Sequence, residues 1–174
     1  MLSLKRKKII TQKKYSKEEV LKRIYLHPQN SWGVNEKVIY RSIDDLFSRL
    51  NQEHLNFFGK NHPLIFIPTS GVYSCALSFP AKIPIILMFP DLIKKLSAAN
   101  PDEGLAILAH ELGHIFYRHS DKNIPILEAQ IEADDFAYQV GLARELTEVL
   151  LQFNDLDTRT RVSYLTSKIL SSGH

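Results

Sequence analysis

Apolar residues recur at helical spacing along most of this chain. In the clearest amphipathic stretch, about 35–53, they lie on one side of a predicted helix. A capping box, Ser16-Lys17-Glu18-Glu19, opens a shorter helix that should end near Leu26. Further helices are expected over 91–98, from 100–103 through 116, and over 125–140, 146–153 and 158–171.

Three short β-rich runs lie in the middle of the chain, at 64–67, 73–79 and 83–89. Turn residues separate the first run from the second, and Pro80-Ala81-Lys82 separates the second from the third. These runs predict a small sheet, which we expect to be antiparallel. With the helices around it, the sheet indicates an α+β domain.

Composition narrows the class of protein. At 174 residues, with 44% hydrophobic and 24% charged residues, the chain fits one soluble globular domain. The longest strongly apolar run, 83–89, is too short for a membrane span, and the charged first ten residues lack the apolar stretch of a secretory signal. Cys75 is the only cysteine, which excludes an internal disulfide and favours a reducing compartment. We therefore expect a cytoplasmic protein.

The net charge of +3 is unevenly distributed. Residues 1–23 carry nine Lys and Arg against two acidic residues, whereas the remainder is mildly acidic. We therefore divide the chain into a basic, flexible arm, 1–15, and a single domain, 16–174. Such an arm could contact nucleic acid or an acidic partner. No aromatic interleaving or nucleic-acid motif supports that role, and a solvated tail is the simpler interpretation.

The chemistry of the chain centres on His110-Glu111-Leu112-Gly113-His114, an HExxH motif in an apolar, proline-free stretch. Residues four apart share a helix face, so both imidazoles can bind one metal ion, with Glu111 beside it as a base. A bare HExxH also arises by chance, with exposed histidines. The flanking apolar residues favour a buried helix instead, and buried His and Glu need partners. The motif therefore predicts a hydrolytic Zn2+ site.

The window 84–137 resembles the zinc peptidases called gluzincins, most closely the family of CaaX prenyl proteases and heat-shock membrane proteases. Soluble anti-repressor peptidases of phage are similar too. The likeness rests on a strand and short helix at 85–93, the acidic helix start at 101–103, the AHELGH-type motif at 109–114, and a downstream helix, 130–137, in which Ala133, Asp134, Phe136 and Ala137 keep the family spacing. It implies a zincin-like fold, with the motif helix and a third-ligand helix packed on a small sheet. It also implies an edge strand that holds an extended peptide substrate.

The resemblance assigns roles to individual residues. It implies that His110 and His114 bind zinc, that Glu111 is the general base, and that Asp134 orients a ligand histidine from behind. The family's third ligand is a glutamate, and its register falls on Gln130.

A carboxylate is the better zinc ligand, so Glu132, in the better-matched part of the motif, is our candidate for the third position. Glu128 and Gln130 itself remain open alternatives. Glu132 and Glu128 each lie two residues from Gln130, about 200° around an ideal helix.

Two other residues near the motif have simpler interpretations. His119 lies five residues past His114, about 140° around a continued helix, and is expected at the surface. Gly113 should allow the sheet or the third-ligand helix to approach closely.

The sequence thus predicts a zinc metalloendopeptidase that hydrolyses peptide bonds by activating water, with a substrate strand beside 73–79 or 83–89. One alternative is a catalytically inactive peptidase fold used as a binding or regulatory module, because of Gln130. The other is a protein that acts through its basic arm, with a structural metal. The open coordination position of a three-ligand site argues against the second.

Overall fold

A computed structural model describes residues 13–71, 74–78 and 83–171 of the protein. The predicted helices and strands are nearly all present, with small shifts at their ends. In chain order the elements are α1 (Lys17–Tyr25), the 3-10 helix η1 (Pro28–Asn35), α2 (Lys37–Ser48), α3 (Gln52–Lys60), β1 (Ile65–Pro68), β2 (Ser74–Ser78), β3 (Pro84–Met88), α4 (Pro90–Leu96), α5 (Asp102–Phe116), the 3-10 helix η2 (His119–Asp121), α6 (Ile126–Gln139), α7 (Ala143–Leu150) and α8 (Leu156–Ser171). The predicted α+β class is confirmed.

Helix starts follow local side-chain signals. The Ser16 hydroxyl accepts a hydrogen bond from the Glu19 backbone, and the Glu19 carboxylate accepts one from the Ser16 backbone, so the predicted capping box is confirmed. The helix predicted over 35–53 is α2, which ends earlier, at Ser48, and a helix that was not predicted, α3, begins at Gln52. The reason is Asn51, whose side chain accepts a hydrogen bond from the His54 backbone and caps a new helix.

The sheet has the order β1-β3-β2. β2 pairs antiparallel with β3, as expected, but β1 pairs parallel with β3, so the prediction of a fully antiparallel sheet is wrong. The expectation assumed that strands adjacent in sequence also pair. Here β2 reverses direction and β3 reverses it again, so β3 runs parallel to β1 when it fills the place beside it. Both edges of β3 are consequently paired, and β1 and β2 are the edge strands.

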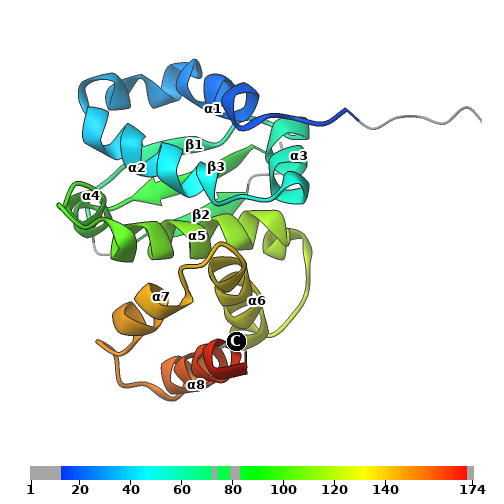
Figure 1. The fold of residues 1–174 in the computed structure, drawn as a ribbon, viewed down its shortest axis with the longest axis vertical. Helices are drawn as coiled ribbons and strands as arrows, with labels where there is room; N and C mark the ends of the chain where they lie inside the picture. The colour runs from blue at the N-terminus through cyan, green and yellow to red at the C-terminus, as the bar shows by residue number, and fades with distance from the viewer. Residues whose placement is uncertain (1–12, 72–73, 79–82, 172–174) are drawn as a thin grey trace, which may run out of the picture.

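The elements form layers around α5. In Figure 1, α1 and α2 lie on one side of the sheet, α5 lies on the other, and α6, α7 and α8 pack beyond α5. Every residue from Gly104 to Gly113 is buried, which confirms the buried helix expected from the apolar flanks of the motif. The helix that carries the motif is therefore held from both sides.

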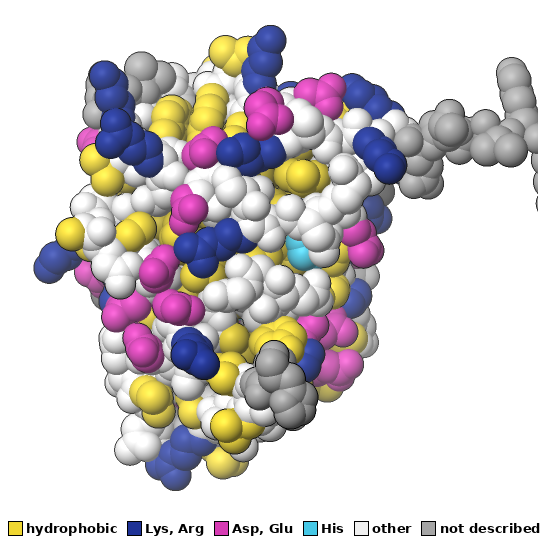
Figure 2. All heavy atoms as spheres, in the orientation of Figure 1, with side chains coloured by type: hydrophobic (Ala, Val, Ile, Leu, Met, Phe, Trp, Pro, Cys, Tyr) yellow, Lys and Arg dark blue, Asp and Glu magenta, His cyan; other side chains and the backbone are white. Residues whose placement is uncertain are grey.

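Most of the predicted basic arm lies outside the described residues, which begin at Lys13. The last residue of that arm, Tyr15, contacts α3: its backbone donates to the Asn56 side chain, and its carbonyl accepts from Gln52. The predicted turn 80–82 and the ends of the predicted strand 73–79 also fall outside the described residues. On the face shown in Figure 2, Lys and Arg side chains are interspersed with Asp and Glu. Among the described helices, none has the length and apolar character needed to cross a bilayer.

Candidate metal centre

The two motif histidines face one another on α5. Their Nε2 atoms are 3.1 Å apart, and the planes of the two rings are nearly perpendicular, at 89°. Two nitrogens bound to one tetrahedral zinc at roughly 2.05 Å would lie about 3.3 Å apart. His110 and His114 therefore present their Nε2 atoms at the spacing of two ligands of a single ion.

A buried ion pair fixes the orientation of His110. The Asp134 carboxylate on α6 is fully buried and lies 2.7 Å from His110 Nδ1. Arg161 on α8 binds the same carboxylate with two nitrogens, each at 2.7 Å. Burial alone would raise the pKa of Asp134, but the hydrogen bonds from Arg161 and His110 outweigh it and hold the pKa below its ordinary value. An ionised carboxylate only accepts, so His110 Nδ1 donates and its Nε2 lone pair points toward His114.

His114 is neutral near pH 7. Burial, followed by electrostatic repulsion from His110, His119 and Arg161, lowers its pKa to about 3. The Nε2 atoms of the two rings face each other at 3.1 Å, so a cation between them would be bound by both. Neutral imidazole is also the form that binds zinc, so this pair fits a zinc ion.

The third position beside the histidines is held by an amide. The Gln130 side-chain nitrogen lies 3.5 Å from His114 Nε2, and the amide can present its oxygen to the same point by rotating. Gln130 and Asp134 are four residues apart on α6 and therefore face the site together. Within residues 13–71, 74–78 and 83–171, no group of three His, Cys, Asp or Glu side chains is arranged to hold a metal. Of the three alternatives for the third position, Gln130 is the one whose side chain lies beside the histidine pair.

The structure does not bring the predicted third ligand, Glu132, to the histidine pair. Its carboxylate lies 2.9 Å from His119 Nε2 and 2.8 Å from Lys122 Nζ. These contacts lower the pKa of Glu132, so it is ionised. The other alternative, Glu128, is exposed on α6. The helix angle explains the result, because side chains two positions from Gln130 point to the opposite side of a regular helix.

The expectation that His119 lies at the surface is wrong. Its side chain is only 8% exposed, and its Nδ1 lies 2.7 Å from His114 Nδ1. The expectation assumed that the helix continues past residue 119, but α5 ends at Phe116 and Arg118 adopts a left-handed backbone conformation, with φ of 56°. That turn carries η2 back toward the motif. Burial also lowers the pKa of His119, although Glu132 opposes the effect.

Gly113 is required for the close approach of α6. A Cβ at this position would lie 2.8 Å from the Ala133 carbonyl oxygen and 2.9 Å from Phe136 Cβ. The expected packing role of Gly113 is confirmed, and its neighbour is the helix that carries Gln130 and Asp134. The tight contact therefore sets the distance between the two halves of the centre.

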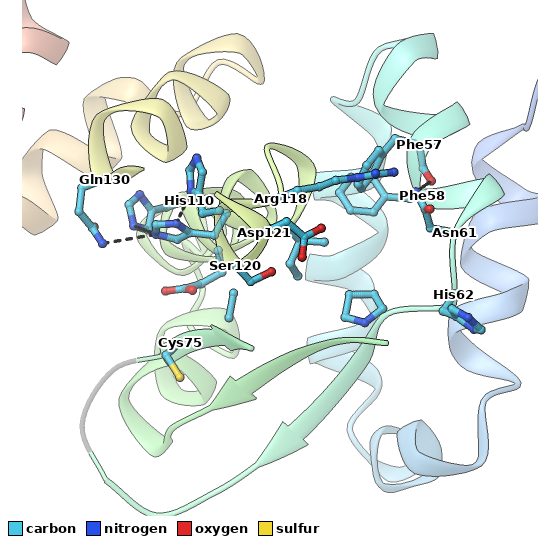
Figure 3. Close-up of a pocket in the computed structure, with 16 residues that line it drawn as sticks. Phe57, Phe58, Asn61, His62, Cys75, His110, Arg118, Ser120, Asp121 and Gln130 are labelled. Atoms are coloured by element: carbon cyan, nitrogen blue, oxygen red, sulfur yellow. Dashed lines mark hydrogen bonds between the residues drawn. The ribbon is translucent and has the colours of Figure 1, made fainter. Parts of the chain in front are cut away.

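The histidines open onto a cleft of about 510 Å³. Glu111, which is 7% exposed, lines it beside the histidines, and Cys75 of β2 lies on the opposite wall (Figure 3). Burial and the charge of Glu111 raise the pKa of the Cys75 thiol. The far end is lined by Phe57 and Phe58 of α3 and by Arg118, whose guanidinium lies 5.6 Å from the Phe57 ring centre. The cleft therefore runs between the edge strand β2 and the motif helix.

Two groups that shape the centre could not be identified from the sequence. Arg161 is 27 residues from Asp134, and no spacing rule connects them. Phe57 and Phe58 lie on α3, a helix that was not predicted and for which the Asn51 cap was the available signal. For Arg161 the missing information was tertiary packing, whereas for Phe57 and Phe58 it was the local helix start at Asn51.

The site resembles that of a metallopeptidase in three features. These are a buried HExxH helix, a histidine whose Nδ1 is hydrogen-bonded to a carboxylate, and a cleft beside an edge strand. The comparison with known proteins agrees: the model of Peptidase family M48 matches residues 76–149. That match runs from within β2 to α7 and includes His110, Glu111, His114, Gln130 and Asp134, but not Arg161 or the cleft residues Phe57, Phe58 and Cys75. The matched part of the chain is thus similar to a zincin-type metallopeptidase family. No curated protein and no solved structure matches the chain.

Proposed function

We propose that this protein is a zinc-dependent metalloendopeptidase in which His110, His114 and Gln130 hold the metal and Glu111 is the general base. The observation that carries the proposal is the pair of Nε2 atoms, 3.1 Å apart at the wall of the cleft, with the lone pair of His110 fixed toward them by Asp134. The family match supports metallopeptidase activity, and such enzymes are typically zinc-dependent. We also propose that, among such enzymes, it is most similar to the CaaX prenyl proteases and the phage anti-repressor peptidases.

The proposed chemistry uses one acid–base residue. Zinc bound at this centre would polarise the scissile carbonyl and lower the pKa of the attacking water. Glu111 follows His110 on α5, about 100° around the helix, so its carboxylate lies beside the ligand pair and not between the rings. From there it would accept the proton of the attacking water and deliver it to the leaving amine. Its burial limits competing solvent in the cleft.

The substrate would bind as an extended strand along β2. Of the two segments suggested by the sequence, β3 is paired on both edges, so it has no free edge for a peptide. Among the described residues, β2 pairs with β3 on one edge only, and Cys75 and Ala76 of β2 line the cleft across from Glu111. A peptide added to β2 would therefore pass the histidines with its backbone hydrogen-bonded to the strand.

Gln130 alters the charge of the proposed centre. Two neutral imidazoles and an amide leave a zinc ion with its full double positive charge, whereas a glutamate in the same place would cancel one unit. Zinc should consequently bind more weakly than to a two-His, one-Glu site and polarise its substrate more strongly.

The proposal is tested by measuring zinc and hydrolysis together. We expect the purified protein to bind one zinc ion per chain and to cleave an unfolded protein substrate. Glu111→Gln should keep the metal, because Glu111 is not a ligand, and should lower kcat/KM at least ~100-fold, the lower end for losing a general base. Glu103→Gln, the same change near the start of α5, is the matched control and should leave both unchanged.

His110→Ala should remove the metal. Zinc binding without hydrolysis by the wild-type chain would favour the inactive binding module. Zinc retained by His110→Ala would refute the ligand assignment.

A further inference from the structure

We propose that His119 is a positioning residue: it orients the His114 ring by accepting a hydrogen bond from His114 Nδ1, and it connects that ring to the Glu132 carboxylate. The inference rests on the proposed function, since it concerns how His114 is held for the metal. It assigns a role to two residues, His119 and Glu132, that do not reach the metal position themselves.

The chain of contacts is continuous and mostly buried. His114 Nδ1 lies 2.7 Å from His119 Nδ1, and His119 Nε2 lies 2.9 Å from Glu132 Oε2. Lys122 Nζ donates to the same carboxylate oxygen at 2.8 Å. The His119 side chain is 8% exposed and the Glu132 side chain 36%, so this series of hydrogen bonds runs from the site to the protein surface.

The positions of the protons follow from the acceptor at the end of this chain. The Glu132 carboxylate only accepts, so His119 Nε2 must carry a hydrogen. In neutral His119 the other nitrogen, Nδ1, is then a lone pair and must accept from His114 Nδ1–H. That leaves His114 Nε2 as the lone pair, pointing toward His110 Nε2. The contacts thus select the one His114 tautomer that can bind a metal through Nε2.

The local fold places His119 for this role. After α5 ends at Phe116, the left-handed conformation of Arg118 turns the chain, and η2 brings the His119 ring beside His114. The Tyr117 ring stacks on His119, with 15° between the ring planes, and limits its rotation. A histidine is needed here because its two nitrogens span the gap between His114 and Glu132.

Both motif histidines are then supported in the same way. Asp134 accepts from His110 Nδ1 directly, whereas Glu132 acts on His114 Nδ1 through the ring of His119. A carboxylate behind a ligand histidine increases the basicity of the nitrogen that faces the metal. Glu132 therefore brings a negative charge to the centre one ring away, where Gln130 supplies none.

The test is the zinc affinity of variants, measured by competition with a chromophoric chelator. His119→Phe keeps a ring but removes both nitrogens and should weaken zinc binding by about 10-fold or more, the usual scale for a residue behind a ligand. His119→Asn keeps an acceptor near the Nδ1 position but cannot reach Glu132, so its affinity should fall between wild type and His119→Phe. It also carries the test if His119→Phe does not fold. Glu128→Gln, an equal charge change on α6, is the matched control and should bind zinc normally.

A double variant separates support from direct ligation. If Glu132 acts through His119, Glu132→Gln should weaken zinc binding in the wild-type background and have no further effect in His119→Phe. Equal losses in both backgrounds would mean that Glu132 acts independently, and would overturn the inference.

Nitrogen-15 NMR of the zinc-loaded protein provides a readout that a purely structural role would not change. It should place the hydrogen of His114 on Nδ1 and that of His119 on Nε2, and the opposite assignment would refute the mechanism. Normal zinc binding by His119→Phe would overturn this inference and leave the proposed function intact. A wild-type chain that binds no zinc would overturn both.

Discussion

The contact between α5 and α6 at Gly113 makes a sharp prediction for Gly113→Ala. The added Cβ would lie 2.8 Å from the Ala133 carbonyl oxygen and 2.9 Å from both Ala133 Cα and Phe136 Cβ. Favourable carbon–carbon contacts begin near 3.5 Å, so α6 must move away by roughly 0.6 Å. Two of the three atoms are backbone, so a side-chain rotation cannot relieve the clash.

Two effects of this substitution oppose each other. Alanine is a better helix former than glycine by about 1 kcal/mol, which stabilises α5. Overpacking of a buried contact costs about 1–3 kcal/mol, and the upper half applies because backbone must move. We therefore expect a net loss of about 1–2 kcal/mol in the free energy of unfolding. For a chain of this size that loss corresponds to a Tm lowered by roughly 2–8 °C.

The same displacement should disturb the metal centre. Gln130 and Asp134 move with α6, whereas His110 and His114 stay on α5, so the 2.7 Å contact between Asp134 and His110 lengthens. Zinc affinity should fall by about 10-fold, as for other losses of support behind a ligand.

Urea unfolding of the metal-free protein, beside zinc titration, measures both effects of Gly113→Ala. Gly104→Ala is the matched control: it lies on the same helix, and its Cβ would lie 2.8 Å from the Leu96 backbone nitrogen of α4, away from the centre. It should cost similar stability but leave zinc affinity unchanged. If Gly113→Ala were as stable as wild type and bound zinc equally well, the proposed coupling between helix spacing and metal binding would be wrong.

Two further predictions concern buried titratable groups. Arg161→Met leaves the Asp134 carboxylate buried without its cation and should destabilise the protein by about 3–5 kcal/mol, measured by urea unfolding. Arg161→Lys, which keeps the charge, should lose less. Burial lowers the pKa of His54, which stays neutral in the fold but binds a proton below about pH 6.5 once unfolded. The free energy of unfolding should therefore fall as pH drops from about 6.5 toward the folded pKa of His54. His54→Phe should reduce the slope of stability against pH by up to about 1.4 kcal/mol per pH unit, measured by urea unfolding at several pH values. An unchanged slope would show that His54 is not the source of this pH dependence.

The parts of the fold that the sequence predicted well depend on local signals. The Ser16 capping box needs only four residues, and the burial of α5 follows from apolar residues on both sides of the motif. The facing of His110 and His114 likewise follows from a spacing of four on one helix. Each of these features is decided within two turns of helix.

The features that were missed depend on where the chain turns. β1 pairs parallel with β3 because it lies along the edge of β3 that β2 leaves open. The sequence of a single strand does not indicate which neighbour it will pair with. His119 was misplaced because a helical wheel applies only inside a helix, and α5 ends three residues before it. A left-handed residue that is not glycine, Arg118, has no strong sequence signature, so the return of η2 was hidden.

Glu132 has the chemistry expected of a zinc ligand but not the position. Because Gln130 occupies the ligand register, the sequence led us to expect a zinc-binding carboxylate at Glu132, which is ionised but lies 2.9 Å from His119 and not beside the ligand pair. Glu132 points away from the histidine pair, because a residue two positions from Gln130 cannot share its helix face. His119 resolves the conflict in the proposed mechanism, since its ring reaches the side of α6 that Glu132 occupies. A loss of zinc affinity in Glu132→Gln would therefore fit either a ligand or a supporting residue, and only its dependence on His119 distinguishes them.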